Sequence, residues 1–394
     1  MSGTGLDRSG DWIAAEPQHW QEEPFLPVPS DHLLEFLCRQ PAFASPRDEE
    51  LRRAAERIGE QLHAFYRDRH ERAASLYAAL DPDRDVRLII EPTAAERRRQ
   101  AADLAELIVD GLRGANYTRL SRQEIEAALE AVSDWGVRLR VNFHVFEHLE
   151  VWARGDIIGQ RERRHWRDLW RPKSVDVAIY QRLAVMFQVR AGQIIDEQLD
   201  PLCLHLRMFK NIPQADVDML LPSTRVRLGW VDRWKILVPT LSGISLNLFK
   251  IIRGAVILAF VGAYGTVALL ALIAASISYA VRSFLHFGRA RDRYLLNMSR
   301  NLYFQKLDSN AGVIARLLDE AEQQDEREAL LAYAVLAAAD GPLPLDQVKR
   351  RAIQWILEAI QVAVDFEADD AMRRLEHLRM ARQDSSGDWS LVSF

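Results

Sequence analysis

The stretch DVAIYQRLAVMFQVR, residues 176–190, predicts a β-strand. This strand, together with the segments on either side of it, indicates the fold class. Val, Tyr and Phe are typical strand formers, and the stretch is too rich in them for a loop. VRLRVNFHVF (137–146) alternates in the same manner, EHLEVWARGD (147–156) continues to a Gly-Asp turn, and PLCLHLRMF (201–209) is a further strand candidate. The sequence therefore predicts a small, antiparallel sheet in the middle of the chain.

Helical patterns precede these strands. Residues 50–80 carry apolar side chains at three- and four-residue steps, which predicts one long amphipathic helix. A second helix is predicted at about 92–112, and Ser121 with Glu124 has the spacing of a capping box. Helices followed by a sheet indicate an α+β unit.

An uncharged run, GAVILAFVGAYGTVALLALIAASISYAV, fills the 28 positions of residues 254–281. A bilayer core needs only about 20 apolar residues, so this run predicts a membrane span. The segment 236–252 is a weaker span, interrupted by Pro239 and Gly243. Two interpretations stay open: a short transmembrane hairpin, which the basic flanks on both sides favour, or a single span with an interfacial first segment.

The end of the chain has the order of a winged helix. Three predicted helices are followed by a strand, a Ser-Ser-Gly turn and a second strand that ends near Phe394. Residues 311–394 hold 9 Lys and Arg against 16 Asp and Glu, which disfavours a phosphate backbone as a partner. A protein partner fits this domain better than nucleic acid.

The predicted fold class is thus an α+β membrane protein. It has a helical N-terminal part with a small antiparallel sheet, a short transmembrane hairpin or single span, and a C-terminal helical, winged-helix-like domain. The predicted domains are a disordered lead (1–24), a cytoplasmic α+β domain (25–222), a membrane region (223–285) and the C-terminal domain (286–394).

Four segments carry a family resemblance: ANYTRLS (115–121), FKNIPQADVDMLLP (209–222), YLLNMSRNLYFQKLDSNAGV (294–313) and DEAEQQDEREALLAY (319–333). With them the sequence resembles the transmembrane protein 143 family, a widespread domain of unknown function in bacteria, plants and animal mitochondria. The resemblance implies a membrane protein whose biochemical role is not established. Because the lead before Phe25 lacks a mitochondrial presequence, we expect a bacterial inner-membrane protein with its soluble domains in the cytoplasm.

The segment 209–222 contains the candidate ligand-binding residues Lys210, Asn211 and Asp216. Lys210 and Asn211 suit a phosphate or a carboxylate, whereas Asp216 suits a cation. A simpler interpretation is favoured, in which Asp216 caps a short helical turn that follows Pro213. The sequence therefore leaves two hypotheses for this segment: a ligand site and a structural helix cap.

Basic and aromatic residues alternate in RERRHWRDLWRPK, residues 161–173. Trp and Arg together are typical of a membrane interface, with an ordinary loop and a nucleic-acid contact as alternatives. His144 and His148 lie four residues apart without an evident third ligand, so we expect no metal, and we expect no cofactor. The predicted membrane-interface residues are Arg164, Trp166, Trp170, Arg282 and Arg289.

The sequence contains no GxSxG, no P-loop, no GxGxxG that opens a helix and no HExxH, so we expect no catalytic residues and favour a non-enzymatic function. The predicted role is a scaffold, sensor or assembly factor. One alternative is a membrane-bound enzyme or binding protein for a lipid or phosphate-bearing ligand, and another is an oligomeric transporter or channel. The expected partners are the lipid bilayer and a protein bound through the C-terminal domain, with homo-oligomers left open. The acidic segment 319–328 is interpreted as a solvated helix face, with contact to a basic partner, such as the stretch 282–293, as the alternative.

Overall fold

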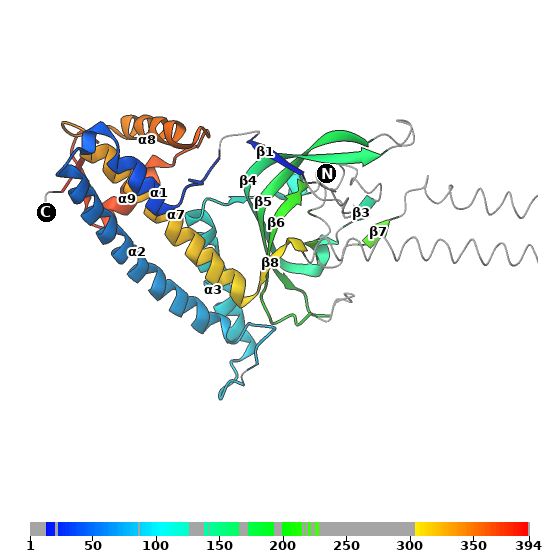
Figure 1. The fold of residues 1–394 in the computed structure, drawn as a ribbon. Coiled ribbons are helices and arrows are strands. Elements are labelled where there is room, and N and C mark those ends of the chain that lie inside the picture. The colour runs from blue at the N-terminus through cyan, green and yellow to red at the C-terminus, as the bar shows by residue number, and fades with distance from the viewer. Residues whose placement is uncertain are drawn as a thin grey trace, which may run out of the picture.

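In the computed structural model an antiparallel sheet packs against a group of helices (Figure 1). The elements below belong to the described residues, which are 13–19, 23–85, 87–125, 138–140, 142–164, 172–192, 199–214, 217, 220–221, 225–227 and 304–392.

The sheet has the strand order β1-β4-β5-β6-β8, with β2 paired to β4 beside β1, and every pair is antiparallel. The predicted antiparallel sheet is therefore confirmed. A second ladder joins β3 to β7, also antiparallel. The strands are β1 (Ile13–His19), β2 (Thr118–Arg119), β3 (Arg138–Arg140), β4 (Phe146–Arg164), β5 (Pro172–Val189), β6 (His205–Pro213), β7 (Arg225–Arg227) and β8 (Lys306–Ser309).

The two faces of the sheet have separate cores, as alternation along a strand requires. Ala184 and Met186 of β5 pack with the helices, together with Met208 of β6. Val185 and Phe187 belong to the core on the opposite face. The Gly-Asp turn that the sequence predicts at 155–156 is wrong, because β4 continues through these residues to Arg164.

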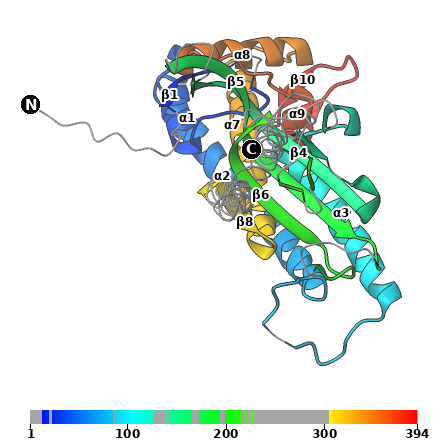
Figure 2. The same ribbon diagram turned by 90° about the vertical axis from the view of Figure 1, so that its right-hand side faces the viewer.

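Three helices, α2, α3 and α7, pack against the face that holds Met186 and Met208 (Figure 2). The long helix predicted at 50–80 is α2, and the helix predicted at 92–112 is α3, which begins at a capping box formed by Thr93 and Glu96. The helices of the N-terminal part are α1 (Ser30–Cys38), α2 (Arg47–Tyr77) and α3 (Ala94–Gly114), with short 3-10 turns η1 (Pro41–Phe43) and η2 (Phe143–Val145); α7 (Ala311–Ala337) follows β8.

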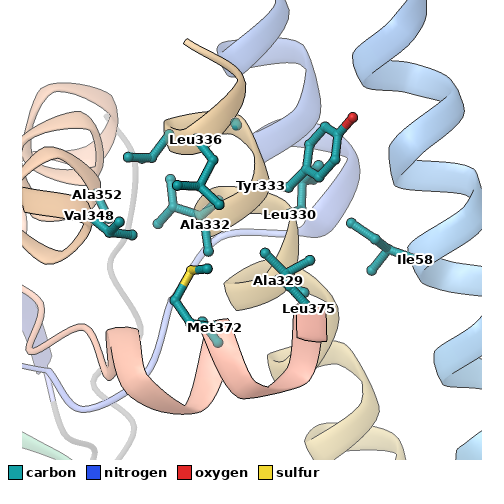
Figure 3. Packing of buried hydrophobic residues seen from close by; sticks show 14 of the residues in the cluster. Ile58, Ala329, Leu330, Ala332, Tyr333, Leu336, Val348, Ala352, Met372 and Leu375 are labelled. Atoms are coloured by element: carbon teal, nitrogen blue, oxygen red, sulfur yellow. The ribbon is translucent and has the colours of Figure 1, made fainter. Parts of the chain in front are cut away.

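The C-terminal unit continues from α7 with α8 (Leu345–Ile360), α9 (Ala368–His377), β9 (Ala381–Gln383) and β10 (Trp389–Leu391). β9 and β10 form an antiparallel hairpin. Leu343, which precedes α8, forms an antiparallel bridge with Trp389 of β10. This is the element order of a winged helix, with α7 as its first helix. The unit shares its core with α1 and α2, and Figure 3 shows Ile58 of α2 facing Ala329 and Leu375.

The structure corrects the membrane part of the predicted fold class. Among the described residues, no helix is long and apolar enough to cross a membrane. The long helix α2 carries charged side chains along its length, and α7 carries them from Arg316 to Glu328. The predictions of an integral membrane protein and of an inner-membrane location are withdrawn on this finding. The segments 236–252 and 254–281, which carried these predictions, lie outside the described residues.

Candidate functional site

The structure places two of the three predicted ligand residues at the end of β6. Lys210 lies opposite Arg182 of β5, and both Lys210 and Asn211 are exposed. Asn211 has a positive φ of 52°, and its carbonyl oxygen accepts a hydrogen bond from Gln305 Nε2 at 3.2 Å. Asp216 lies outside the described residues, so the three are not brought together here.

The predicted membrane-interface residues fall almost entirely outside the described part of the chain. Only the backbone of Arg164 is described, as the last residue of β4 opposite Pro172. The other four, Trp166, Trp170, Arg282 and Arg289, lie outside the described residues. Their role stays a sequence-based prediction.

The polar groups that the fold does bring together lie on α7. Gln324, Asp325 and Glu328 are buried on this helix. The interpretation of residues 319–328 as a solvated face is therefore wrong for Asp325 and Glu328, whereas Asp319 is exposed. α2, α3 and α9 surround α7, and they exclude water from side chains that an isolated helix would expose.

Asp325 joins three helices. Tyr66 Oη of α2 donates a hydrogen bond to Asp325 Oδ2 at 2.6 Å, and the Arg374 guanidinium of α9 lies 2.5 Å from the same oxygen. Burial raises the pKa of Asp325, an effect that the charge of Arg374 opposes. Burial likewise raises the pKa of Tyr66, so its hydroxyl remains a donor. A buried carboxylate of this kind is stable only with such partners.

Glu328 lies one turn further along α7. Asn116 Nδ2 donates to Glu328 Oε1 at 2.8 Å, and Gln324 Nε2 donates to the same atom at 2.7 Å. Burial raises the pKa of Glu328 to about 8, against the opposing effect of these two hydrogen bonds. The carboxyl group is therefore largely protonated at neutral pH.

Glu320 joins α7 to the sheet. Arg154 of β4 donates to Glu320 Oε2 at 2.8 Å and to the Ala115 carbonyl oxygen at 3.0 Å. The Tyr117 hydroxyl donates to the same Glu320 oxygen at 2.8 Å. The Arg154 guanidinium also lies 4.7 Å from the centroids of the Tyr117 and Phe25 rings. One arginine therefore ties the sheet, the end of α3 and the N-terminal segment to α7.

A cleft of about 370 Å³ opens beside Asp325 and Glu328. Of the four arginines in its lining, three are paired with acids: Arg69 lies 3.8 Å from Asp110, and Arg374 binds Asp325. Arg373 is paired with Asp369 and Asp370 of its own helix. Charges paired in this way suit the attachment of α9 to the helices better than they suit a reaction.

Metal binding has no support among the described residues. No cluster of three His, Cys, Asp or Glu within these ranges is arranged to hold a metal ion. His144 lies in η2, whereas His148 lies in β4 with its Nε2 atom 3.7 Å from Glu150 Oε1.

Glu320, Asp325 and Glu328, together with their hydrogen-bonding partners, form what we call the α7 network. This network is the site that sequence reasoning missed. A signal for it exists in the sequence, because residues 329–336 are apolar on every side of the helix. A helix that is apolar all round is buried, and the acidic turns directly precede this segment in the same helix. The partners of those acids come from distant elements, and no local pattern predicts them.

Residues 175–312 match the model of a family described as a protein of unknown function (DUF3754). The chain contains a DUF3754 domain. In the structure this domain begins within β5 and ends at the start of α7, so it includes β6 and β8. The acidic network of α7 follows it directly. No solved structure matches the chain.

Proposed function

We propose that this chain is a non-enzymatic sensor or scaffold protein in which α7 couples the antiparallel sheet to the C-terminal unit. The observation that carries this proposal is the set of partners bound by the acids of α7. These partners come from α1, α2, α9, β4 and the end of α3. The pairs are Asp319 with His70, Glu320 with Arg154, Glu322 with His63, Asp325 with Arg374, Glu326 with Ser30, and Glu328 with Asn116.

The paired state of these carboxyl groups supports coupling rather than catalysis. A general acid or base has to reach a proton of the substrate. Asp325 and Glu320 instead bind arginine and tyrosine side chains of the protein itself. Each pair connects two elements, so a displacement of one element changes the environment of the next.

For the C-terminal unit we propose a protein partner. Arg373 and Arg374 of α9 are both engaged by acids of the chain, which leaves α9 poorly suited to a phosphate backbone. The acidic balance of residues 311–394 supports the same choice. Self-association of the chain is one form that such a contact can take.

The finer family assignment is also a proposal. We propose that the DUF3754 domain is of the transmembrane protein 143 type, as a statement of kinship and not of location. Two of the segments that carry the resemblance, 209–222 and 294–313, overlap the matched residues 175–312. An alignment of many family members tests this: the two segments should recur at the same spacing, and their absence would refute the kinship.

A double-mutant cycle tests the coupling through α7. Arg154→Met removes the link from β4 to α7, and Arg374→Met removes the link from α9 to α7. Independent substitutions add to within about 0.5 kcal/mol. Because both links act on the same helix, we expect their effects on the free energy of unfolding to differ from additivity by more than about 0.5 kcal/mol.

The control cycle pairs Arg374→Met with Arg53→Ala. Arg53 forms an exposed pair with Glu49 near the start of α2, and its removal is expected to cost only about 0–1 kcal/mol, additively. Urea unfolding curves of the full chain give all the values. Additivity in both cycles would show that α7 is a passive support and would refute the sensor role.

A further inference from the structure

A second cavity, of about 520 Å³, lies at the other end of α7, where α7 begins beside β6 and β8 (Figure 1). Loops that precede α3 and β6 complete its walls. It is separate from the α7 network, because the lining residues belong to different turns. The charged and polar lining includes Asp81, Asp83, Arg84, Arg97, Asp200, Cys203, His205, Arg207, Lys306, Ser309 and Asn310.

Asn310 fixes the wall of this cavity at the start of α7. Its φ is 52°, its Oδ1 atom accepts a hydrogen bond from the Leu206 backbone at 3.1 Å, and its own N–H donates to the Leu206 carbonyl oxygen at 2.8 Å. Asn310 Nδ2 also donates to Asp83 Oδ2 at 2.5 Å. The N-terminus of a 27-residue helix is thus held against β6. Such a terminus carries partial positive charge and favours anions.

His205 supplies an independent sign of a ligand. Its side chain is 5% exposed and stacks on Phe187 with ring centroids 5.1 Å apart. One ring nitrogen is hydrogen-bonded to the Asp200 backbone, while Nε2 is buried and has no partner. Since burial lowers the pKa of His205, the neutral ring presents Nε2 as an acceptor. A buried acceptor of this kind requires a donor.

The remaining lining provides cations. Lys306 and Arg207 lie on the adjacent strands β8 and β6. Arg97 binds Glu91 through its terminal nitrogen at 2.6 Å, yet its Nε atom is buried and without a partner. The cavity therefore contains one donor without an acceptor, Arg97 Nε, and one acceptor without a donor, His205 Nε2. Cationic groups and carboxylates lie beside them.

We propose that this cavity binds a small phosphate monoester that carries hydroxyl groups. Its phosphate lies at the start of α7 near Lys306 and accepts a hydrogen bond from Arg97 Nε. One of its hydroxyl groups donates to His205 Nε2, and others face Asp81 and Asp200. The ligand contains both the acceptor that Arg97 lacks and the donor that His205 lacks.

Calorimetric titration of the full chain tests this proposal. The probes are D-ribose 5-phosphate, inorganic phosphate and ribose. We expect ribose 5-phosphate to bind most tightly, inorganic phosphate more weakly, and ribose alone not measurably. Lys306→Gln should weaken the binding of ribose 5-phosphate about tenfold or more, because a charge-assisted hydrogen bond is lost.

Lys349→Gln is the matched control. It also removes one lysine charge, but Lys349 lies on α8 and pairs with Asp365 at 2.8 Å, so binding should be unchanged. His205→Phe retains a ring to stack on Phe187 and removes the acceptor. It should weaken ribose 5-phosphate more than inorganic phosphate. Equal losses with Lys306→Gln and Lys349→Gln would indicate diffuse charge attraction and overturn the site.

A measurement on the unaltered chain guards against a variant that does not fold. Histidine ring nitrogen shifts, recorded by NMR, should change for His205 when ribose 5-phosphate is added and not when ribose is added. No binding of ribose 5-phosphate at millimolar concentration, or an unchanged His205 signal, would refute the proposal. These readouts do not depend on the additivity test of α7, so either proposal can fail alone.

Discussion

At the scale of single residues, Glu328 shows how packing changes the chemistry of a side chain. It is one of six acids in residues 319–328, and the sequence does not distinguish it from the others. Only the approach of Asn116 and the surrounding helices buries it. The folded-state pKa of about 8 lies above the ordinary value of 4.5, so the folded chain holds this proton more tightly than the unfolded chain does.

This sign predicts that stability falls as the pH rises. The contribution of Glu328 is fully present below pH 4.5 and is lost as the pH rises through about 8. Between those values it lowers the free energy of unfolding by up to about 1.4 kcal/mol per pH unit. The Glu328→Gln side chain stays neutral, and its carbonyl oxygen can still accept hydrogen bonds from both amide groups. We therefore expect the free energy of unfolding of this variant to depend less steeply on pH.

Urea unfolding at pH 6 and at pH 8 measures the difference. Glu358→Gln on α8 is the control, because Glu358 is exposed and should leave the slope as it is in the unaltered chain. A Glu328→Gln slope equal to that of the unaltered chain would show that Glu328 is ionised in the folded state at both pH values.

At the scale of elements, the sequence predicts the main strands and helices because each has a local pattern. Residues 176–190 and 50–80 became β5 and α2 with small shifts of their ends. The turn at Gly155 is wrong for a physical reason. Gly155 has a φ of +74° inside β4, a conformation that glycine adopts without cost and that also occurs in turns. The dipeptide alone does not distinguish a kinked strand from a turn.

Two effects favour glycine at position 155 of β4: the positive φ of the backbone and the close approach of Gln181. Alanine substitution separates these two effects. At Gly155 a Cβ atom would lie 2.9 Å from Gln181 Cβ, whereas at Gly192, with a φ of +82°, it would meet no atom within 4 Å. Gly192→Ala should cost about 1–2 kcal/mol from the backbone conformation alone. Gly155→Ala should cost about 1–3 kcal/mol more, because the alanine also displaces Gln181.

Chemical denaturation of the two variants provides the comparison, with Gly192→Ala as the matched control for backbone strain. If both cost the same, the contact with Gln181 is unimportant and β4 tolerates a side chain at this position.

At the scale of the whole molecule, the sequence predicts the α+β class but not which distant elements share a core. Leu26 donates its backbone N–H to Gln324, across 298 residues of sequence. No periodicity within one helix encodes such a contact, since it depends on how α1 and α2 approach α7. The membrane prediction rested on a long uncharged run, its basic flanks and the family resemblance, and no described helix supports it. The acidic network of α7 was missed for the same reason as the shared core.

A shared core predicts shared stability. Ile58 is fully buried on α2 and faces Ala329 of α7 and Leu375 of α9 (Figure 3). Ile58→Ala should lower the free energy of unfolding by about 2–5 kcal/mol, through lost burial and the cavity that remains. Because α9 packs on the same core, amide hydrogen exchange should accelerate in α9 and in β9–β10 as well as in α2.

Leu357→Ala on α8 is the control, because this side chain is 49% exposed and its removal should change the stability by no more than about 0.5 kcal/mol. Hydrogen exchange with mass spectrometry resolves the segments. Acceleration confined to α2 would mean that the C-terminal unit is stable by itself. Acceleration in both means that residues 26–62 and 329–389 unfold as one cooperative unit, which is the condition for α7 to transmit a change between the sheet and the C-terminal unit.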